Sequence, residues 1–434
     1  MAQILIYAFS IGLTLLIPVI YYRNYKRKVR IAREKLQRAT TLGLTEPISL
    51  HPKIDPNRCI GVGGCVKACP EGEILGIIDG RAELVSPSKC IGHGACQLAC
   101  PVDAISLVFG TERRGVEIPY VKPNFETNVE GIFIAGELGG MGLIRNAITQ
   151  GAEAIDYIAE SLRDRDPGMF DVAIIGAGPA GIAATLEAEK HGLRYLTLEQ
   201  DDIGGTVLSY PRQKLVMTQP MDIPLWGKFK RRAITKEELI ELWMEILQKT
   251  GVDIRTFEKV QDIDREDGAY QIISSKGEYL ARRVLLAIGR RGTPRKLGVP
   301  GERSPKVAYK LIEPEQYQRK KVLVVGGGDS AVEAALSLAD QPGTDVTLSY
   351  RRAAFTRIRE ENYDRIHEAM SRDRVHVLYE SRVLEIQPTS VLIEKQGTEF
   401  VIDNDYVFVF IGGELPFQFL QRIGIQIEMK YGER

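Results

Sequence analysis

All six cysteines of this 434-residue chain lie between Cys59 and Cys100, and none occurs in the 334 residues that follow. They form two blocks with one spacing, CIGVGGCVKACP from Cys59 and CIGHGACQLACP from Cys90. Such local clustering indicates a metal or cluster module, whereas a disulfide framework would distribute its cysteines over a secreted fold. We therefore expect a small module in this region that is built around metal ligands.

The two blocks resemble the bacterial two-cluster ferredoxin run, C-x2-C-x2-C-x3-C-P, given twice within residues 52–110. In that family, thiolates on glycine-rich loops ligate Fe–S clusters, and the fourth cysteine of each run serves the other cluster. The resemblance implies one cluster held by Cys59, Cys65 and Cys100, and another held by Cys90, Cys96 and Cys69.

Each block departs from the ferredoxin pattern at its second cysteine, which is Val62 in the first block and His93 in the second. Valine offers no lone pair, so the first site fits a [3Fe–4S] cluster. A neutral imidazole can bind iron, so the second site fits a [4Fe–4S] cluster with His93 as its fourth ligand. Two alternatives stay open. The module could hold zinc or nothing, since three cysteines and a histidine also suit zinc, and His93 could be only a hydrogen-bonded neighbour.

A dinucleotide motif begins at Asp171, where an apolar strand expected over 172–175 runs into a glycine turn and then a helix. The glycines permit a tight turn and let the backbone approach a pyrophosphate at the helix N-terminus. The next strand ends at Glu199, 18 residues after the turn, where a carboxylate suits a ribose diol. The candidate contacts are Gly176, Gly178, Gly181, Glu199, Gly204, Gly205 and Thr206.

The same device recurs from Lys320, with a strand over 322–325, a turn containing Gly326, Gly328 and Ala331, and a helix. Its second strand ends in Arg351 and Arg352 instead of an acid. Guanidinium groups pair with a 2′-phosphate, which an acid would repel. We therefore expect NADPH rather than NADH at this second site. The alternative for the two arginines is a solvated loop.

Two further strand-plus-glycine segments lie at RVLLAIG, which ends at Gly289, and at YVFVFIGGELP, residues 406–416. Together with the two turns they resemble the flavoprotein disulfide-reductase superfamily, closest to its small thioredoxin-reductase-like branch, over residues 111–434. The resemblance implies an α/β fold with two Rossmann-like domains, the first for FAD and the second for NADPH. A small α+β ferredoxin-like domain precedes them.

Members of that family normally end with a segment that here lies before the first Rossmann motif, at residues 125–158. It matches at Thr127, Gly131, Gly136 and Glu137, with Glu in place of the usual Asp. We therefore expect a circular permutation, which a domain tolerates when its termini lie close together. The resemblance implies that Glu137 bonds the ribityl chain of FAD and that a helix from about Leu143 points its positive end at the flavin. An ordinary linker is the alternative.

The absence of cysteine after Cys100 limits the chemistry. Thioredoxin reductases carry a Cys-x-x-Cys pair in the NADPH domain, so disulfide reduction by that route is excluded. No catalytic side chain is expected, because FAD, NADPH and the clusters carry the reaction. We expect an oxidoreductase that passes electrons between NADPH, FAD and Fe–S clusters, to or from a redox protein or a quinone. The alternatives are an electron-delivery or sensor subunit of a larger membrane complex and a direct flavin-dependent quinone or small-molecule reductase.

The first 22 residues suggest a membrane anchor. The run from Ile4 to Tyr22 is uncharged over 19 residues, close to the roughly 20 that span a bilayer. Eight basic residues between Arg23 and Arg38 follow against one acid, Glu34. This predicts a single-pass transmembrane helix in the cell membrane, N-terminus outside and catalytic domains cytoplasmic, with a basic stalk that meets lipid headgroups. A signal peptide would need its positive charge before the run, and a buried core helix is the other alternative.

The expected domain plan has seven parts: a transmembrane anchor at 1–22, a basic stalk at 23–50, the Fe–S domain at 51–110, the permuted segment at 111–168, the FAD domain at 169–295, the NADPH domain at 296–412 and a return to the FAD domain at 413–434. The chain is 44% hydrophobic and 26% charged, which suits globular domains and excludes a disordered or multi-span protein. A formal net charge of zero argues against a nucleic-acid binder. A homodimer is compatible with the sequence.

Overall fold

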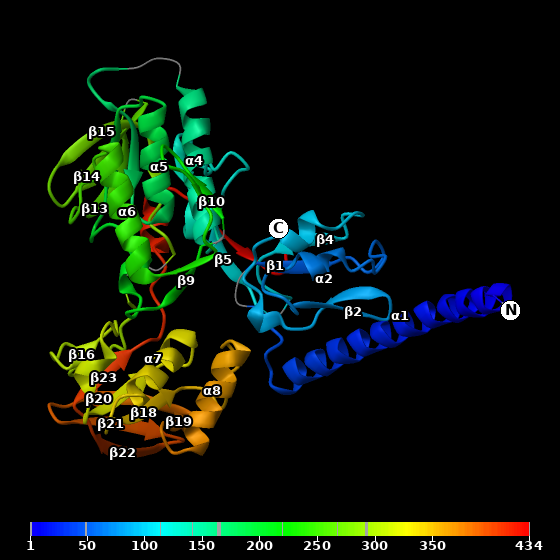
Figure 1. The fold of residues 1–434 in the computed structure, drawn as a ribbon. Helices are drawn as coiled ribbons and strands as arrows, with labels where there is room; N and C mark the ends of the chain where they lie inside the picture. The colour runs from blue at the N-terminus through cyan, green and yellow to red at the C-terminus, as the bar shows by residue number, and fades with distance from the viewer. Residues whose placement is uncertain are drawn as a thin grey trace. The chain divides into compact units, whose positions relative to one another are not determined.

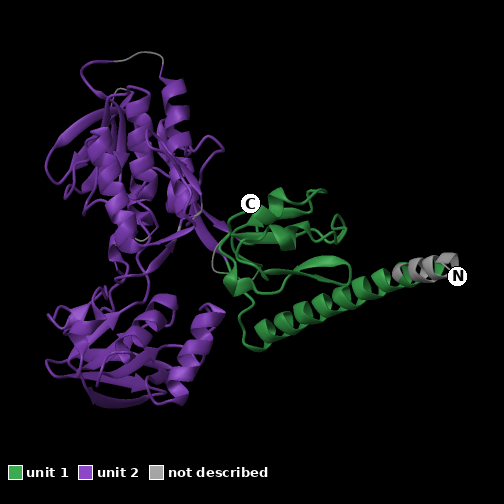
Figure 2. Cartoon of the chain, in the orientation of Figure 1, with its two compact units in different colours: residues 1–114, 431–434 green, residues 115–430 purple. Residues whose placement is uncertain are grey.

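The computed structural model describes residues 2–47, 50–112, 114–140, 142–162, 166–218, 220–266, 268–290 and 294–433, without the side chains of residues 2–6, 8–11, 13 and 217 (Figure 1). The chain divides into two compact units (Figure 2). Unit 1 contains residues 1–114 and 431–434, and unit 2 contains residues 115–430. The last residues of the chain therefore return to the unit in which the chain begins.

Unit 1 is a small α+β domain preceded by a long helix. Strand β1 (His51–Ile54) pairs antiparallel with β4 (Ile105–Val108), and β2 (Leu75–Ile78) pairs antiparallel with β3 (Arg81–Leu84). Two short helices, α2 (Gly64–Ala68) and α3 (Ala95–Leu98), follow the two cysteine loops, and a 3-10 turn, η1 (Pro87–Lys89), precedes the second loop. The core includes Cys65 and Cys96 themselves, beside Leu75, Ala82 and Ile105. The hydrophobic core is therefore built directly against the thiols.

Helix α1 (Ala2–Thr41) is continuous, and its second half packs on this domain. Ala32 is buried, and a Cβ added to Gly76 of β2 would lie 2.6 Å from the Ala32 Cβ. Arg33 pairs with Asp79, and Lys35 pairs with Glu73. Part of the basic segment that was expected to meet lipid headgroups thus binds acids of the protein itself.

The structure corrects the membrane prediction. Among the residues that the structure describes, no helix combines the length and the hydrophobicity that a bilayer-spanning helix needs. The predicted transmembrane helix is therefore unsupported, and the predicted cell-membrane localisation, with the N-terminus outside and the domains cytoplasmic, is wrong. The physical reason is that the uncharged run ends at Tyr22, where the helix turns strongly basic and continues without a break. The side chains of residues 2–6, 8–11 and 13 lie outside that description.

The larger sheet of unit 2 runs in the order β13 (Val260–Glu266), β14 (Ala269–Ser274), β15 (Glu278–Leu286), β7 (Phe170–Ile175) and β8 (Tyr195–Leu198). Strand β6 (Ile132–Ile134) lies parallel to the end of β15. Helices α4 (Ile144–Ser161), α5 (Pro179–Lys190) and α6 (Lys236–Thr250) belong to the same part of the chain. Val172, Ala173 and Ile174 are fully buried, as expected for a parallel strand covered on both faces.

The second parallel sheet runs in the order β16 (Val307–Ala308), β23 (Tyr406–Val409), β17 (Lys321–Val325), β18 (Asp345–Tyr350) and β19 (His376–Tyr379). It carries α7 (Asp329–Ala339) and α8 (Glu360–Ser371). An antiparallel sheet of β20 (Ser381–Ile386), β21 (Ser390–Lys395) and β22 (Thr398–Asp403) packs its apolar side chains against β17 and β23. The two strand–glycine–helix motifs thus lie in two separate sheets, the first mixed and the second all parallel.

Smaller elements complete unit 2. Strand β9 (Leu215–Met217) pairs with β12 (Ala233–Thr235), and β10 (Met221–Ile223) pairs with β11 (Gly227–Phe229). Near the end of the chain, α9 (Phe417–Arg422) leads into β24 (Ile427–Lys430), which pairs antiparallel with β5 (Val116–Pro119). The 3-10 turns are η2 (Gly136–Gly139), η3 (Gly205–Ser209) and η4 (Pro314–Tyr317).

Candidate cofactor sites

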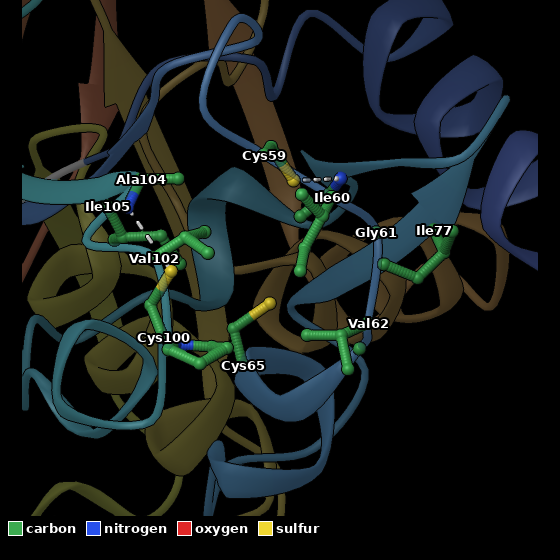
Figure 3. Close-up of a pocket in the computed structure, with 13 residues that line it drawn as sticks. Cys59, Ile60, Gly61, Val62, Cys65, Ile77, Cys100, Val102, Ala104 and Ile105 are labelled. Atoms are coloured by element: carbon green, nitrogen blue, oxygen red, sulfur yellow. Dashed lines mark hydrogen bonds between the residues drawn. The ribbon is translucent and has the colours of Figure 1, made fainter.

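The first cysteine loop, residues 59–70, lines an open pocket that we call site 1 (Figure 3). Cys59, Cys65 and Cys100 line it together, although Cys100 comes from the second block. The backbone N–H of Ala82 donates to Cys59 Sγ at 3.3 Å, and that of Ala104 donates to Cys100 Sγ at 3.2 Å. Three converging thiols with N–H donors at their sulfur atoms fit an Fe–S cluster.

The second loop, residues 90–101, lines a separate pocket, site 2. Cys69, Cys90 and Cys96 line it, with His93 and Glu71 beside them. The two cavities therefore divide the six cysteines into the two groups of three that the ferredoxin resemblance implies. The N–H donors from Ala82 and Ala104 were not anticipated. Ala82 lies on β3, 23 residues from Cys59, so no local sequence signal could have indicated it.

His93 lies beside Cys69, with its Nε2 3.8 Å from Cys69 Sγ. Its Nδ1 accepts a hydrogen bond from the Ala95 backbone N–H at 3.2 Å. A neutral imidazole that accepts at Nδ1 carries its proton on Nε2, so the ring presents an N–H toward the sulfur. If Nε2 bound iron, the proton of the neutral ring would lie on Nδ1. Nδ1 could then no longer accept the hydrogen bond from the Ala95 N–H.

Burial controls the ionisation of the thiols. It raises the pKa of Cys90 and of Cys96 to about 11, and it raises the pKa of Cys65 and Cys69 as well. Neighbouring thiolates add to the effect at Cys65, Cys90 and Cys96, because several negative charges cannot share a small cavity without a cation. Metal binding must therefore displace protons from these thiols.

The first glycine turn closes tightly at the carboxyl end of β7. Gly176 has φ +107°, and a Cβ on Gly181 would lie 1.8 Å from the Gly176 oxygen. A Cβ on Gly178 would meet nothing within 4 Å, so open space remains at the N-terminus of α5. The turn that contains Gly289 lies beside it, since a Cβ on Gly176 would come 2.6 Å from the oxygen of Ala287. This open cradle fits a dinucleotide pyrophosphate.

Glu199, at the end of β8, is buried beside this turn. Its Oε2 accepts from the Ala177 N–H at 2.6 Å, and its Oε1 accepts from the Asp201 N–H at 2.9 Å. Each oxygen keeps a lone pair for a ribose hydroxyl. A Cβ added to Gly205, which precedes Thr206 in η3, would lie 3.0 Å from the Gly178 Cα. The Gly204 N–H donates to the Ala177 oxygen at 2.9 Å. The candidate FAD residues of this half thus gather at one sheet edge.

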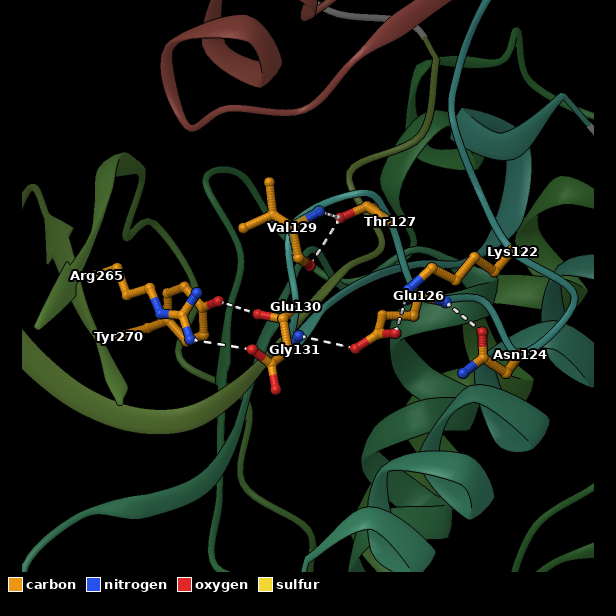
Figure 4. Close-up of polar contacts among 9 residues, drawn as sticks. All are labelled: Lys122, Asn124, Glu126, Thr127, Val129, Glu130, Gly131, Arg265 and Tyr270. Atoms are coloured by element: carbon orange, nitrogen blue, oxygen red, sulfur yellow. Dashed lines mark hydrogen bonds and ion pairs between the residues drawn. The ribbon is translucent and has the colours of Figure 1, made fainter. Parts of the chain in front are cut away.

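The segment before β6 is held by a network of polar contacts (Figure 4). The buried Thr127 exchanges hydrogen bonds with Val129 at 3.0 and 3.1 Å, and the Gly131 N–H donates to Glu126 Oε1 at 3.0 Å. Burial would raise the pKa of Glu126, but hydrogen bonds from Lys122 and Gly131 outweigh it and hold that pKa below its usual value. The turn therefore fixes where β6 enters the sheet.

Beyond β6, the chain reaches the same edge. A Cβ on Gly136 would lie 2.9 Å from the Ala180 Cβ of α5, and the Gly136 N–H donates to Gln150 Oε1 at 2.9 Å. Glu137 follows at the start of η2. Gly151 of α4 packs so closely on α5 that a Cβ there would lie 2.1 Å from the Ala180 oxygen. Gln150 was not anticipated, because its role appears only when helix α4 folds back beside η2.

The second glycine turn repeats the first, with Ala331 in the place of the third glycine. Gly326 has φ +147°, and a Cβ added there would lie 3.0 Å from the Ala331 Cβ and 2.3 Å from the Phe410 oxygen. A Cβ on Gly328 would meet nothing within 4 Å, so this turn also leaves an open cradle. Arg351 and Arg352 follow β18 directly and are exposed. Two exposed guanidinium groups at the end of this strand fit a nucleotide with an additional phosphate.

Comparison with known proteins bears on the family to which the chain belongs. The sequence profile of the pyridine nucleotide-disulphide oxidoreductases matches residues 173–433. The chain belongs to the pyridine nucleotide-disulphide oxidoreductase family. A profile for a 4Fe–4S dicluster domain also matches residues 51–101, so this family member carries an Fe–S domain ahead of the matched region.

This pyridine nucleotide-disulphide oxidoreductase is 32% identical over 270 residues to a ferredoxin–NADP reductase of Ignicoccus hospitalis, across 60% of this chain and 83% of that protein. It is 26% identical over 265 residues to the bacilliredoxin reductase Bdr of Bacillus subtilis, across 60% of this chain and 82% of that protein. Its fold resembles the bacillithiol disulfide reductase Bdr of Staphylococcus aureus, with a TM-score of 0.54 and 25% identity, across 60% of this chain and 81% of that chain.

Several predictions about this oxidoreductase are confirmed. It is an FAD-dependent NAD(P)H oxidoreductase with a ferredoxin-like 4Fe–4S domain, and its cofactors are FAD, NADPH and Fe–S clusters. The α/β fold with dinucleotide-binding sheets is also confirmed. All six cysteines lie in unit 1, so unit 2 of this family member has no cysteine pair of its own.

Proposed function

We propose that this oxidoreductase transfers electrons between NADPH, FAD, the two Fe–S sites and a one-electron carrier protein of the ferredoxin type. The observation that carries the proposal is the pair of three-thiol cavities on the same chain as a cysteine-free dinucleotide-binding unit. NADPH supplies two electrons with one hydride, one proton is released, and two carriers each take one electron. The reverse direction uses the same groups. The ferredoxin–NADP reductase relative supports this class of partner.

The side chains bind and orient the cofactors rather than react. We propose that Cys59, Cys65 and Cys100 hold the cluster of site 1 and that Cys69, Cys90 and Cys96 hold the cluster of site 2. Bound iron would satisfy thiols that burial otherwise keeps protonated. We propose that His93 supports Cys69 with an N–H···S hydrogen bond and is not itself a ligand, because its Nδ1 already accepts from Ala95. Such a second contact orients a ligand and tunes its basicity.

The FAD and NADPH cradles use backbone and carboxylate groups. We propose that Gly176, Gly178 and Gly181 admit the FAD pyrophosphate, that Glu199 accepts from the ribose hydroxyls, and that Glu137 accepts from the ribityl chain. Gly204, Gly205, Thr206, Gly136 and Gly289 would line the same edge. At the second turn, Gly326, Gly328 and Ala331 would admit the NADPH pyrophosphate.

Arg351 and Arg352 would select NADPH by pairing with its 2′-phosphate. A charge-assisted hydrogen bond contributes about 1.5–3 kcal/mol, so Arg351→Ala should weaken NADPH binding roughly tenfold or more. NADH binding should remain nearly unchanged, and Arg382→Ala, on the exposed edge of β20, provides the control. Titration calorimetry of the FAD-loaded protein with each nucleotide measures the effect. Equal losses for NADPH and NADH would show that these arginines do not contact the 2′-phosphate.

We also propose that unit 2 is a circularly permuted member of its family. Several contacts support this. Strands β5 and β24, from far ends of the chain, form an antiparallel pair in which Val116 faces Lys430. Leu420, Ile423 and Ile425 pack in one core with Ile132 and Ile134. A short hairpin between Lys430 and Val116 would therefore restore the ordinary order. It would leave residues 111–168 and 413–434 as one continuous part of the FAD domain, as the predicted domain plan requires.

A rearranged unit 2 tests the permutation. Residues 169–430 would be joined by an Asn-Gly turn to residues 115–162, without the Fe–S domain. The proposal expects this chain to retain stoichiometric FAD and to show NADPH-dependent bleaching of the flavin absorbance. Failure to retain FAD, when the full chain retains it under the same conditions, would contradict the permutation.

Anaerobic reduction by NADPH tests the electron-transfer function. Protein prepared anaerobically with full iron and sulfide should show flavin bleaching, then cluster bleaching, and finally reduction of an added ferredoxin. Flavin bleaching without cluster reduction would instead favour direct reduction of a quinone or small molecule from flavin. Cluster reduction without turnover would favour an electron-delivery or sensor subunit.

A further inference from the structure

We propose that the surface around site 1 docks an acidic one-electron carrier protein. This rests on the proposed function and names the chemistry of its partner. One electron leaves site 1 and reduces one carrier, and no bond or proton moves. The proposal is carried by three observations on unit 1: an exposed apolar rim, unpaired basic residues beside it, and a basic ridge of α1 that adjoins it.

The rim of site 1 is apolar and open. Ile60 is 65% exposed and Val62 is 62% exposed, and both line the cavity that holds the three thiols (Figure 3). Leu98 of α3 is 88% exposed, and the end of α3 lies against loop 1, where a Cβ on Gly64 would come 3.0 Å from the Ala99 oxygen. Exposed apolar side chains grouped in this way mark an interaction site.

Basic residues flank this rim closely. Arg58 precedes Cys59, and Arg81 precedes Ala82, whose N–H donates to Cys59 Sγ. Both guanidinium groups are exposed, and neither forms an ion pair with another residue that the structure describes. The nearby Asp55 accepts the Asn57 N–H at 2.9 Å, so it turns toward its own loop.

Helix α1 extends this basic surface. The β2–β3 turn touches loop 1, because a Cβ on Gly61 would lie 2.0 Å from the Gly80 oxygen. On its other side, Asp79 of the same turn pairs with Arg33 of α1. Lys26 and Arg30 lie on the face of α1 that carries Arg33, at spacings of seven and three residues. At about 1.5 Å per residue, Lys26 lies roughly 10 Å further along the helix than Arg33.

Two acids in this region are paired with bases of helix α1. Glu34 pairs with Arg30 at 3.6 Å, and Asp79 pairs with Arg33. Lys26 is 4.7 Å from the ring of Tyr22 and has no carboxylate partner in the described part of α1. Asp55, Glu83 and Asp103 are also exposed in this region, but the exposed bases outnumber them: Arg58, Lys67 and Arg81 near loop 1, and Arg23, Lys26, Arg27 and Lys28 on helix α1. This positive excess attracts an acidic partner and repels a basic one.

Site 2 lacks these features. The equivalent residues Ile91 and His93 are half-buried, and a Cβ on Gly92 would lie 2.5 Å from the Leu50 oxygen. Leu50 is itself buried, so the chain before β1 covers loop 2. A partner can therefore approach site 1 more closely than site 2. Small contact areas suffice for electron-transfer encounters, so an apolar patch with a charged surround is adequate.

The test uses the full chain, loaded with FAD and clusters, and an acidic plant-type [2Fe–2S] ferredoxin as the probe. Arg58→Glu combined with Arg81→Glu should lower the second-order rate of ferredoxin reduction at least tenfold at low salt. The difference should shrink as salt rises, because screening weakens the charges. Lys26→Glu alone should give a smaller loss. Lys228→Glu with Lys230→Glu, two exposed lysines in unit 2, is the control with the same charge change and should have no effect.

Two measurements separate the possible failures. Anaerobic bleaching of flavin and clusters by NADPH should be unchanged in every variant, and its loss in the wild type would defeat the proposed function itself. Reduction of a basic cytochrome c should not slow in the Arg58 and Arg81 variant. Equal slowing of ferredoxin and cytochrome would overturn the docking proposal. The docking proposal is also overturned if the Arg58 and Arg81 variant reduces ferredoxin at the wild-type rate but no longer binds phosphatidylglycerol vesicles.

Discussion

The two cysteine loops share one sequence pattern, yet they differ in their access to solvent. Loop 1 presents Ile60 and Val62 outward, whereas the matching residues of loop 2, Ile91 and His93, are half-buried. The backbone conformations agree, since Gly61 and Gly92 have φ +67° and +76°. The difference lies in what each glycine touches: the β2–β3 turn in loop 1 and the buried Leu50 in loop 2. A repeated ligand pattern therefore produces two chemically similar sites with different surroundings.

The largest expected effect comes from removing one thiol of each loop. Cys65→Ala and Cys96→Ala should each eliminate one cluster, because only three cysteines line each cavity. Each variant should lose about half of its acid-labile sulfide. Reduction of carrier protein should fall to background in Cys65→Ala if site 1 is the exit. Sulfide analysis and stopped-flow reduction of ferredoxin measure both effects. Retention of full sulfide in either variant would contradict the two-site assignment.

Val62→Cys sharpens the comparison by restoring the missing ligand of loop 1. Valine has no lone pair, so the wild-type site should bind three irons and give a [3Fe–4S] signal in the oxidised state by electron paramagnetic resonance. The variant should lose that signal as the site becomes [4Fe–4S]. Val62→Ser provides a control of similar size without the thiolate. A wild-type sample that contains zinc and no sulfide would show that the module is structural.

Glycine substitutions test how each loop is held. Gly61→Ala and Gly92→Ala force a positive φ on alanine and place its Cβ 2.0 Å from Gly80 O and 2.5 Å from Leu50 O. Gly80→Ala is the matched control, since it has φ +77° but nothing within 4 Å of a Cβ. The positive φ alone costs an alanine about 1–3 kcal/mol, so Gly80→Ala should shorten the cluster lifetime modestly. Gly61→Ala and Gly92→Ala should shorten it more, because they add a steric clash to that backbone strain. Decay of cluster absorbance at a fixed temperature measures this, and equal lifetimes would contradict the steric argument.

His93→Ala should produce the smallest change. If His93 donates to Cys69, its loss should leave the iron content unchanged and lower the reduction potential of site 2. An N–H···S bond favours the more negative, reduced cluster, and about 59 mV corresponds to a tenfold change for one electron. A shift of some tens of millivolts is therefore expected in a redox titration monitored by electron paramagnetic resonance. Loss of one iron from site 2 would show instead that His93 is a ligand.

Much of the fold follows from local signals. The apolar run into Gly176 and Gly181, and its repeat at Gly326 and Ala331, predicts two strand–turn–helix motifs, and both are present. A side chain at Gly181 would collide with the Gly176 oxygen, so the turn needs a glycine there whatever surrounds it. Such requirements act within a few residues, which is why sequence reveals them.

The first helix shows where local patterns mislead. The apolar run to Tyr22 and the basic residues after it suggested an anchor with a stalk at the lipid surface. The structure instead packs Ala32 on Gly76 and pairs Arg33 with Asp79. Those partners lie more than 40 residues away, so no pattern within the helix could indicate them.

The sequence by itself determined the ligand types, the two glycine turns and the excluded dithiol, because each depends on residue identity and short spacing. The resemblance to ferredoxins already implied how the six thiols divide between the two sites. Only the tertiary structure decided which loop is open and which nitrogen of His93 faces Cys69. The reason is physical. Burial, hydrogen-bond direction and solvent access depend on residues such as Leu50, Ala82 and Ala95, whose backbone atoms reach the sites only after the chain has folded.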